Sequence, residues 1–408
     1  MKFRTLCAGL LALLFSLPAQ AQGVTIGAAG APDASAALEV RSTAQGLLFP
    51  RLTSVQRGAI AAPAAGLLVF QTDNTPGVYY YDGTFWRNLT TGFVSAAAGA
   101  TTTLAGSTQG SADGTGAAAQ FNSPAGVACD GSGNVHVADT NNGRIRRIVA
   151  ATGVVSTLAG GFSSPNGVAY DGDGNMYVAD TNGNRIRRIE AVTGVVSTFA
   201  GTGTAGLNNG TGAAAQFNHP TGVACDGYGN VYVADQGNNC IRFIELGTGQ
   251  VKTVAGSTQG YADGADTAAQ FNGPTGVACD GRGNVYVADL GNHRIRRIVE
   301  ATGVVSTLAG STRGYAEGTG AAAQFNRPAG VACDGNGNVY VADRANHRIR
   351  RIVAATGVVT TLAGSSTKGF ANGTDTAAQF NRPAGVASDA SGNLYVADTF
   401  NNRIRVIK

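Results

Sequence analysis

Residues 274–310 read PTGVACDGRGNVYVADLGNHRIRRIVEATGVVSTLAG, and close copies of this stretch recur from Pro124 almost to Lys408. The tripeptide Val-Ala-Asp recurs with steps of 41, 55, 54, 54 and 55 residues, ending at Asp139, Asp180, Asp235, Asp289, Asp343 and Asp398. Self-similarity at such a regular spacing is the signature of a repeat architecture. The fold of most of the chain therefore follows from the structure of one repeat.

One repeat contains four short candidate strands, separated by turns rich in Gly, Asn and Asp that favour tight hairpins. In the quoted copy these strands are 276–280, 284–289, 294–299 and 304–310. The second strand is apolar on both faces, whereas a sheet with one wet face would alternate apolar and polar residues. A small four-stranded sheet with two covered faces packs between copies of itself, which predicts a blade of a β-propeller.

The number and order of the strands predict a closed ring. The motif Pro-x-Gly-Val-Ala begins six repeats, and the strand end Thr-x-Ala-Gly also occurs six times. However, the first such strand end, Thr103–Gly106, precedes every repeat, and the last repeat, Pro383–Lys408, lacks its fourth strand. We therefore expect an all-β, six-bladed propeller of four-stranded antiparallel blades, in which residues around 100–106 complete the last blade. Closure also removes the exposed sheet edges of an open array.

The repeated pattern PxGVAxDxxGNxYVADxxNHRIRRI resembles the NHL repeat, and the resemblance covers roughly residues 95–408. It implies an NHL β-propeller. Propellers similar in fold include proteins that bind other macromolecules, some of them RNA, and also metal-dependent enzymes.

The chain divides into three parts. Residues 1–21 are typical of a secretory signal peptide, with Lys2 and Arg4 before a short apolar core and a small-residue cleavage site at 19–21. Residues 22–95 form a small β-rich module, and residues 96–408 form the propeller. The apolar core is too short to span a bilayer, so we expect a secreted or cell-surface protein without a transmembrane segment.

The net charge of +4 includes two charges that leave with the signal peptide. A nearly neutral mature chain argues against a nucleic-acid partner. We expect a protein or glycan ligand instead.

The module 22–95 contains expected strands at 37–40, 66–71 and 78–81, and an expected helix at 54–60 with Ser54 as its N-cap. It resembles N-terminal modules of exported, fibre-like or adhesin-like proteins of Bacteroidetes-type bacteria. About 70 residues of this composition form a marginal core. Self-association, as a trimer or another oligomer, would complete it, and the alternative is a small spacer domain.

One face of the propeller is expected to carry long loops. From Thr-x-Ala-Gly to the next Pro, five loops span 18 or 19 residues, whereas the loop Gly160–Pro165 spans only 5. The connections on the opposite face are tight turns. Long loops on a rigid scaffold commonly carry binding sites. We call this side the long-loop face, and the short second loop predicts an opening in it.

The same face carries the loops after Val-Ala-Asp, where Asn and His recur at equal positions. The candidate ligand-binding residues are Asn142, Asn292, His293, Arg344, Asn346, His347, Tyr261 and Tyr315. Each set has two interpretations. The polar residues could form a ring of ligand contacts or cap their own loops, and the aromatic residues could hold a ligand or fix the loops, with the structural interpretation favoured.

Each Val-Ala-Asp aspartate is followed five residues later by an arginine, which predicts a repeated structural ion pair. The predicted pairs are Asp139/Arg144, Asp180/Arg185, Asp289/Arg294, Asp343/Arg348 and Asp398/Arg403. The third repeat is the exception, because Cys240 stands where Asp235 would meet an arginine.

No set of residues indicates catalysis or a resident metal. Cys129, Cys225, Cys279 and Cys333 share one strand position, which favours small buried side chains over metal ligands or disulfides. Asp171, Asp173 and Asn175 have the D-x-D-x-N spacing of a calcium loop without its distal Glu, so we expect no cofactor, with calcium as the alternative. The sequence thus predicts a non-catalytic binding or scaffold protein. The alternative is a metal-dependent lyase or hydrolase with a site at the mouth of the central channel.

Overall fold

The computed structural model describes residues 24–27, 38–41, 49–60, 63–64, 67–72, 77–81, 86–88, 100–190 and 193–408. The chain forms two compact units, Met1–Val94 and Ser95–Lys408. The predicted signal peptide, residues 1–21, lies outside the described residues. In the part of the chain that the structure describes, no helix has the length and apolar character needed to cross a membrane.

The first unit contains two small sheets. Strands β1 (Val24–Gly27) and β2 (Leu38–Arg41) pair in parallel. A four-stranded sheet follows in the order β3-β4-β5-β6, with β3 at Arg51–Leu52, β4 at Leu68–Gln71, β5 at Gly77–Tyr81 and β6 at Trp86–Asn88. The strands expected at 37–40, 66–71 and 78–81 are therefore present, with slightly different ends.

Among the described residues of this unit, the helix α2 runs over Ser54–Gly58, and its N-cap is Thr53, so the expectation that Ser54 caps it was wrong. Thr53 has extended backbone angles, and its hydroxyl accepts a hydrogen bond from the Gln56 amide at 3.2 Å. In return, Gln56 Oε1 accepts from the Thr53 amide at 2.9 Å. This reciprocal pair is a capping box, which satisfies two backbone donors at once.

The second unit forms six antiparallel sheets among its described residues, which we number in chain order. Sheet 1 is β9 (Pro124–Cys129), β10 (Asn134–Asp139), β11 (Arg144–Val149) and β12 (Val154–Gly160); sheet 2 is β13 (Pro165–Tyr170), β14 (Asn175–Asp180), β15 (Arg185–Glu190) and β16 (Val196–Ala200); sheet 3 is β18 (Pro220–Cys225), β19 (Val231–Asp235), β20 (Cys240–Ile244) and β21 (Gln250–Ala255). Sheet 4 is β23 (Pro274–Cys279), β24 (Asn284–Asp289), β25 (Arg294–Val299) and β26 (Val304–Gly310); sheet 5 is β28 (Pro328–Cys333), β29 (Asn338–Asp343), β30 (Arg348–Val353) and β31 (Val358–Ala363); sheet 6 is β32 (Val386–Ser388), β33 (Leu394–Asp398), β34 (Arg403–Ile407) and β7 (Thr101–Ala105).

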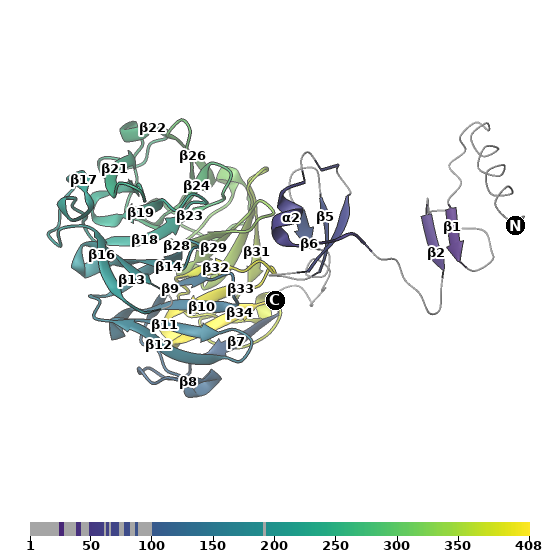
Figure 1. The fold of residues 1–408 in the computed structure, drawn as a ribbon. Helices are drawn as coiled ribbons and strands as arrows, with labels where there is room; N and C mark the ends of the chain where they lie inside the picture. Colours follow the sequence, from purple (N-terminus) through teal and green to yellow (C-terminus); the bar gives the residue numbers. More distant parts are fainter. Residues whose placement is uncertain are drawn as a thin grey trace, which may run out of the picture. The chain divides into compact units, whose positions relative to one another are not determined.

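The sheets follow one another around a closed ring. The first strand of each sheet contacts the first strand of the next, and β32 of sheet 6 contacts β9 of sheet 1. These first strands lie near the centre of the propeller and the last strands lie at its periphery (Figure 1). As the sequence predicts, β7 completes sheet 6 by pairing with β34, with Ala105 opposite Ile404 and Thr101 opposite Ile407.

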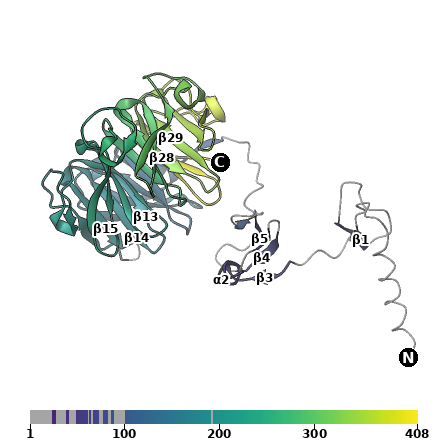
Figure 2. The same ribbon diagram turned by 90° about the horizontal axis from the view of Figure 1, so that it is seen from above.

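Neighbouring sheets pack against one another (Figure 2), and the buried core clusters join residues of adjacent sheets. On β24 the valines face sheet 3, where Val287 packs with Tyr232, while Tyr286 faces sheet 5 and packs with Val341. All four side chains are almost completely buried. Burial of a side chain of this size stabilises the fold by about 1.5–3 kcal/mol. The apolar character of both strand faces, seen in the sequence, is thus explained by packing between sheets.

Around the axis the first strands approach so closely that only glycine fits. A Cβ atom added to Gly276 would collide with the carbonyl of Ala329, and one added to Gly385 would collide with that of Ala125. The same relation links each pair of neighbouring sheets through Gly126, Gly167, Gly222 and Gly330. The strands surround a central channel of about 430 Å³.

Candidate ligand-binding face

Each Val-Ala-Asp aspartate forms its ion pair with the arginine seven residues later, not five. In sheet 4, Arg296 Nη1 donates to Asp289 Oδ2 at 3.0 Å, and both side chains are fully buried. The same pairs are Asp139–Arg146, Asp235–Arg242, Asp343–Arg350 and Asp398–Arg405 at 2.9–3.1 Å, and Asp180–Arg187 at 3.5 Å. Asp235 is therefore no exception, because its partner is Arg242.

The predicted pairs Asp139/Arg144, Asp180/Arg185, Asp289/Arg294, Asp343/Arg348 and Asp398/Arg403 were wrong for a geometric reason. Asp289 does lie opposite Arg294 in the register of β24 and β25. The Arg294 side chain, however, turns outward, and its guanidinium lies 3.8 Å from the ring centre of Tyr261. Arg296, two residues further along β25, supplies the inward guanidinium.

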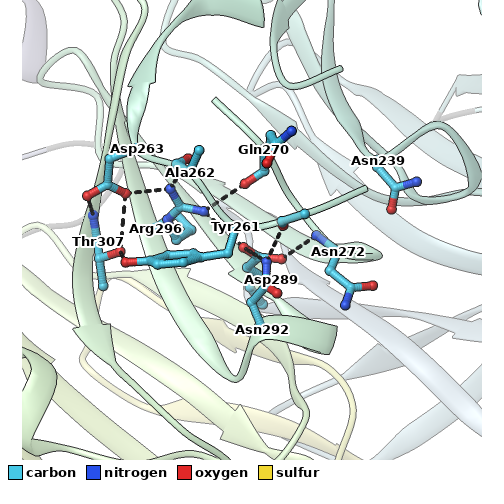
Figure 3. A network of polar contacts seen from close by, with 12 residues as sticks. Asn239, Tyr261, Ala262, Asp263, Gln270, Asn272, Asp289, Asn292, Arg296 and Thr307 are labelled. Carbon is cyan, nitrogen blue, oxygen red and sulfur yellow. Dashed lines mark hydrogen bonds and ion pairs between the residues drawn. The ribbon is translucent and has the colours of Figure 1, made fainter. Parts of the chain in front are cut away.

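The buried guanidinium of Arg296 fastens the long loop to the sheet (Figure 3). It donates to the carbonyls of Gln270 at 3.0 Å and Ala262 at 2.8 Å, and to the carboxylate of Asp263. It also lies 5.2 Å from the ring centre of Phe271. Charge-assisted hydrogen bonds are the stronger kind, so each long loop is held rigidly to its sheet.

Asp289 is satisfied by more than its arginine. Its Oδ1 accepts from the Asn272 amide at 2.8 Å, and its Oδ2 accepts from Asn292 Nδ2, also at 2.8 Å. Burial raises the pKa of this carboxyl group, while these donors oppose the rise. The equivalent Asp343 and Asp398 have a pKa of about 6 for the same reason.

The recurring asparagines join this network. Asn292 Nδ2 donates to the Gly260 carbonyl of the long loop at 2.7 Å, in addition to Asp289. The same two contacts are made by Asn142, Asn238, Asn346 and Asn401. These contacts favour the structural interpretation of the asparagines over a ring of ligand contacts.

Sheet 2, beside the short loop, keeps its Asp180–Arg187 pair but lacks the asparagine and the long loop that the asparagine binds. Gly183 stands at the asparagine position, and a Cβ there would lie 2.6 Å from the Asp180 carboxylate. Sheets 1, 3, 4 and 5 gain a fifth strand from their long loops, β8 (Gly114–Thr115), β17 (Gly210–Thr211), β22 (Gly264–Ala265) and β27 (Gly318–Thr319), whereas sheet 2 does not. In the other sheets the asparagine donates to a carbonyl of the long loop. Sheet 2 has no long loop, and it also has no asparagine at this position.

The loop tyrosines cover the outward arginines. The Tyr261 hydroxyl lies 3.1 Å from Thr307 Oγ1, and the Tyr315 hydroxyl lies 3.0 Å from Thr361 Oγ1. The guanidinium of Arg348 stacks at 3.7 Å from the ring centre of Tyr315, as that of Arg294 does on Tyr261. Both rings remain about half exposed, at 47% and 43%. They are fixed in place and still present an aromatic surface to solvent.

The two loop histidines bridge neighbouring sheets. His293 Nδ1 accepts from the Arg327 amide at 3.1 Å, which joins sheet 4 to sheet 5, and His347 Nδ1 accepts from the Arg382 amide at 3.0 Å. Asparagine oxygens make the same bridge from Asn184, Asn239 and Asn402. Burial and nearby arginines lower the pKa of both histidines.

A cavity of about 660 Å³ on this face is lined by four arginines, of which only Arg344 was a candidate from sequence. The others are Arg313, Arg327 and Arg382, and His293 lies at the same wall. Arg344 also lines the central channel, so it stands where the cavity and the channel mouth meet.

A position-by-position comparison of the repeats could have found these arginines. The residue before the repeat proline is arginine only in sheets 5 and 6, being Ser123, Ser164, His219, Gly273, Arg327 and Arg382 in turn.

The opposite face is built from hydrogen-bonded turns. Asp171 Oδ1 accepts from the amides of Asp173 and Asn175, as the corresponding aspartate does in the other sheets. Nothing in this geometry tests calcium binding, which stays the alternative to the expected absence of a cofactor. His136 replaces the strand tyrosine, and its Nε2 lies 3.1 Å from Asp130 Oδ2, where other sheets place a tyrosine hydroxyl. Over the described ranges, no three His, Cys, Asp or Glu side chains gather as a metal site.

The four aligned cysteines end the first strands and are partly buried. Burial raises the pKa of Cys129, Cys225, Cys279 and Cys333. A thiol held in its neutral form is a weak nucleophile and a poor metal ligand. All described cysteines are free of disulfides.

This ring of antiparallel sheets is a β-propeller. The chain carries NHL repeats, because the NHL repeat family matches residues 121–148, 162–189, 271–298, 325–352 and 380–407. Residues 217–244, the sixth copy by spacing, are not among these matches. There CIRFI replaces RIRRI, although sheet 3 has the same strand order as the others. Residues 25–107 match a family described as "Phage tail like trimerisation region".

Proteins with related sequences share the repeat region. Protein SUPPRESSOR OF QUENCHING 1, chloroplastic, of Arabidopsis thaliana is 32% identical over 278 residues, covering 50% of this chain and 26% of that protein. NHL repeat-containing protein 2 of Homo sapiens is 32% identical over 170 residues, covering 38% of this chain and 23% of that protein. The chain therefore spans about a quarter of the length of these curated relatives.

Among solved structures, an auxiliary nutrient binding protein from Bacteroides thetaiotaomicron is similar in fold, with a TM-score of 0.61. The two chains are 18% identical, and the match covers 76% of each. At this identity the likeness concerns the fold alone.

Proposed function

We propose that this protein is a non-catalytic binding protein that holds a protein or glycan ligand on the long-loop face. The observation that carries this proposal is the construction of that face. Five long loops are each fixed by a buried arginine, as Arg296 fixes the loop of sheet 4, and two of them present half-exposed tyrosines. Rigid surfaces with aromatic side chains bind ligands at a low cost in conformational entropy.

Two further features support this role. The structurally similar Bacteroides protein is described as an auxiliary nutrient binding protein, so the same fold serves binding in a relative. The sequence of residues 1–21 has the character of a signal peptide, and we therefore place the protein outside the cytoplasm, in a secreted or cell-surface location.

The N-terminal unit would assemble the propellers. Residues 25–107 match a family described as a trimerisation region, and we propose a homotrimer. The side chain of Val55 on α2 is 79% exposed, and we place it in the contact between copies. A trimer presents three long-loop faces, and linked sites raise the overall affinity without new contacts.

A binding screen of the mature chain tests the proposal. The chain is applied to an array of glycans and extracellular proteins, alongside a Tyr261→Ala/Tyr315→Ala double variant and a Tyr228→Ala control. Tyr228 is 87% exposed in a turn of the opposite face, so the control removes an aromatic ring from the other side. We expect at least one ligand that the double variant binds about tenfold more weakly and the control binds equally. Loss of binding in the control alone would contradict the assignment of the face.

A further inference from the structure

Four arginines of sheets 5 and 6 gather around one cavity of the long-loop face. Arg313, Arg327, Arg344 and Arg382 line one cavity of about 660 Å³ with His293. At the positions equivalent to Arg344, the other sheets carry Thr140, Thr181, Gln236, Leu290 and Thr399. The cluster is therefore no consequence of the repeat, because the repeat does not require arginine at these positions.

These guanidinium groups lack the carboxylate partners that the repeat arginines have. No described carboxylate lies within 4.0 Å of any of the four, whereas Arg296 and its equivalents are all paired. The Arg344 side chain is half-buried. Burial and the charges of Arg382 and Arg327 together lower the pKa of Arg344.

Like charges held together in a partly desolvated site repel one another. An anion that enters the site relieves this repulsion and forms charge-assisted hydrogen bonds. The planar guanidinium fork matches carboxylate, sulfate and phosphate groups in particular. A cavity of this volume lies in the usual range for ligand sites, about 300–1,000 Å³, and exceeds the size of one oxyanion.

We propose that this cavity is an oxyanion-binding subsite for a ligand that carries at least two carboxylate, sulfate or phosphate groups. The subsite lies at the mouth of the central channel, because Arg344 lines both. The inference deepens the proposed function and rests on it for the remainder of the ligand. The subsite itself is testable with simple anions.

The test is isothermal titration of the full chain with inorganic diphosphate and with citrate at low ionic strength. We expect saturable binding that weakens as salt is added. Arg344→Gln should weaken it about tenfold, which corresponds to about 1.4 kcal/mol. Arg327→Gln provides a second variant in case the first is misfolded, and thermal melting checks both. Arg147→Gln, an exposed arginine of sheet 1, removes the same charge away from the cavity and should change nothing.

A second titration distinguishes the sources of the oxyanion. Oligogalacturonate presents carboxylates along a sugar chain, whereas diphosphate and citrate are free small molecules. Tighter Arg344-dependent binding of oligogalacturonate supports an acidic glycan, and equal or weaker binding supports a free polyanion. Equal affinities of the wild type and both variants for every probe would overturn the subsite, as would binding of single-stranded RNA alone. If the array screen finds no ligand while diphosphate binds through Arg344, the proposed function fails and the subsite stands. If the array finds a ligand while no anion binds through Arg344, only the subsite is ruled out.

Discussion

The guanidinium of Arg296 meets the carboxylate of Asp289, seven residues earlier, at 3.0 Å, with neither side chain exposed to solvent. Four more sheets repeat this buried pair, and each pair supports a long loop as well as the sheet. The pair therefore links the stability of the propeller to the shape of its long-loop face.

Removing the cation of this pair should be costly. We expect Arg296→Met to lower the free energy of unfolding by about 3–5 kcal/mol, because it leaves the Asp289 carboxylate buried without its partner. Arg294→Met is the matched control, since Arg294 points outward onto Tyr261 and should cost about 1 kcal/mol or less. Urea denaturation followed by circular dichroism measures both, and similar losses for the two variants would contradict the assignment.

The close approach of strands at the axis gives a second prediction. Gly276→Ala should destabilise the propeller by about 1–3 kcal/mol, because its new Cβ meets the Ala329 carbonyl. Gly247→Ala, where a Cβ meets no atom within 4 Å, should stay within about 0.5 kcal/mol of the wild type. Differential scanning calorimetry measures the melting temperatures. A Gly276→Ala variant with the melting temperature of the wild type would contradict the close packing of strands at the axis.

The histidine bridges make stability depend on pH. The folded-state pKa of His293 and His347 lies below the ordinary value of 6.5, so the unfolded chain binds more protons between the two values. The contribution of these histidines to the free energy of unfolding should therefore be largest above about pH 6.5 and decline as the pH falls through that value to the lowered pKa, whereas the raised pKa of Asp343 and Asp398 gives those two groups the opposite dependence. Protonation of Nδ1 also removes the acceptor for the amides of Arg327 and Arg382.

Replacing both histidines by asparagine tests this pH effect, because Asn184, Asn239 and Asn402 make the same bridge in other sheets. A His293→Asn/His347→Asn variant should keep the wild-type stability near neutral pH and lose part of the decline at acidic pH. The surrounding charges, Arg294, Arg313 and Lys368, are positive and remain in the variant. Urea unfolding across the acidic range measures the slope, and identical slopes for both proteins would exclude the histidines as its source.

The proposed trimer predicts a mass in solution. Size-exclusion chromatography with light scattering should give three times the chain mass for the mature protein. Val55→Asp should shift the population to smaller species, because a charge would be placed in an apolar contact. Tyr228→Asp makes a similar change at an exposed position of the propeller and should leave the trimer intact. A monomeric wild type at micromolar concentration would refute the assembly.

The sequence predicted those features that depend on periodicity. The sheets and the closure of the ring could be derived from three sequence features. These are the repeat spacing, the apolar faces of strands such as Asn284–Asp289, and the extra strand near Thr103 that precedes the first repeat. The choice between Arg294 and Arg296 was missed, because equal spacing in a repeat does not tell which long side chain turns inward. The cap at Thr53 was missed by one residue, since neighbouring Thr and Ser are both good N-caps.

The arginine cavity escaped prediction for a different reason. Arg313, Arg327 and Arg344 belong to sheet 5 and its long loop, whereas Arg382 belongs to sheet 6, and each is a departure from the repeat pattern at its position. The pairing of Pro328 with Asp343 brings Arg327 near Arg344 within sheet 5, and the packing of sheet 6 beside sheet 5 brings Arg382 to the same wall. Such a site appears in sequence as a departure from the repeat, whereas the residues that recur in every copy, such as Asn292, hold the scaffold together.

The pairing of β7 with β34 sets the order of events during protein synthesis. Ala105 leaves the ribosome almost 300 residues before its partner Ile404, so the propeller has no closed ring until nearly the whole chain has been made. In the proposed trimer, the N-terminal unit would emerge first and would meet its copies on neighbouring nascent chains. Assembly through that unit would then precede completion of the propellers, and three half-made rings would mature side by side.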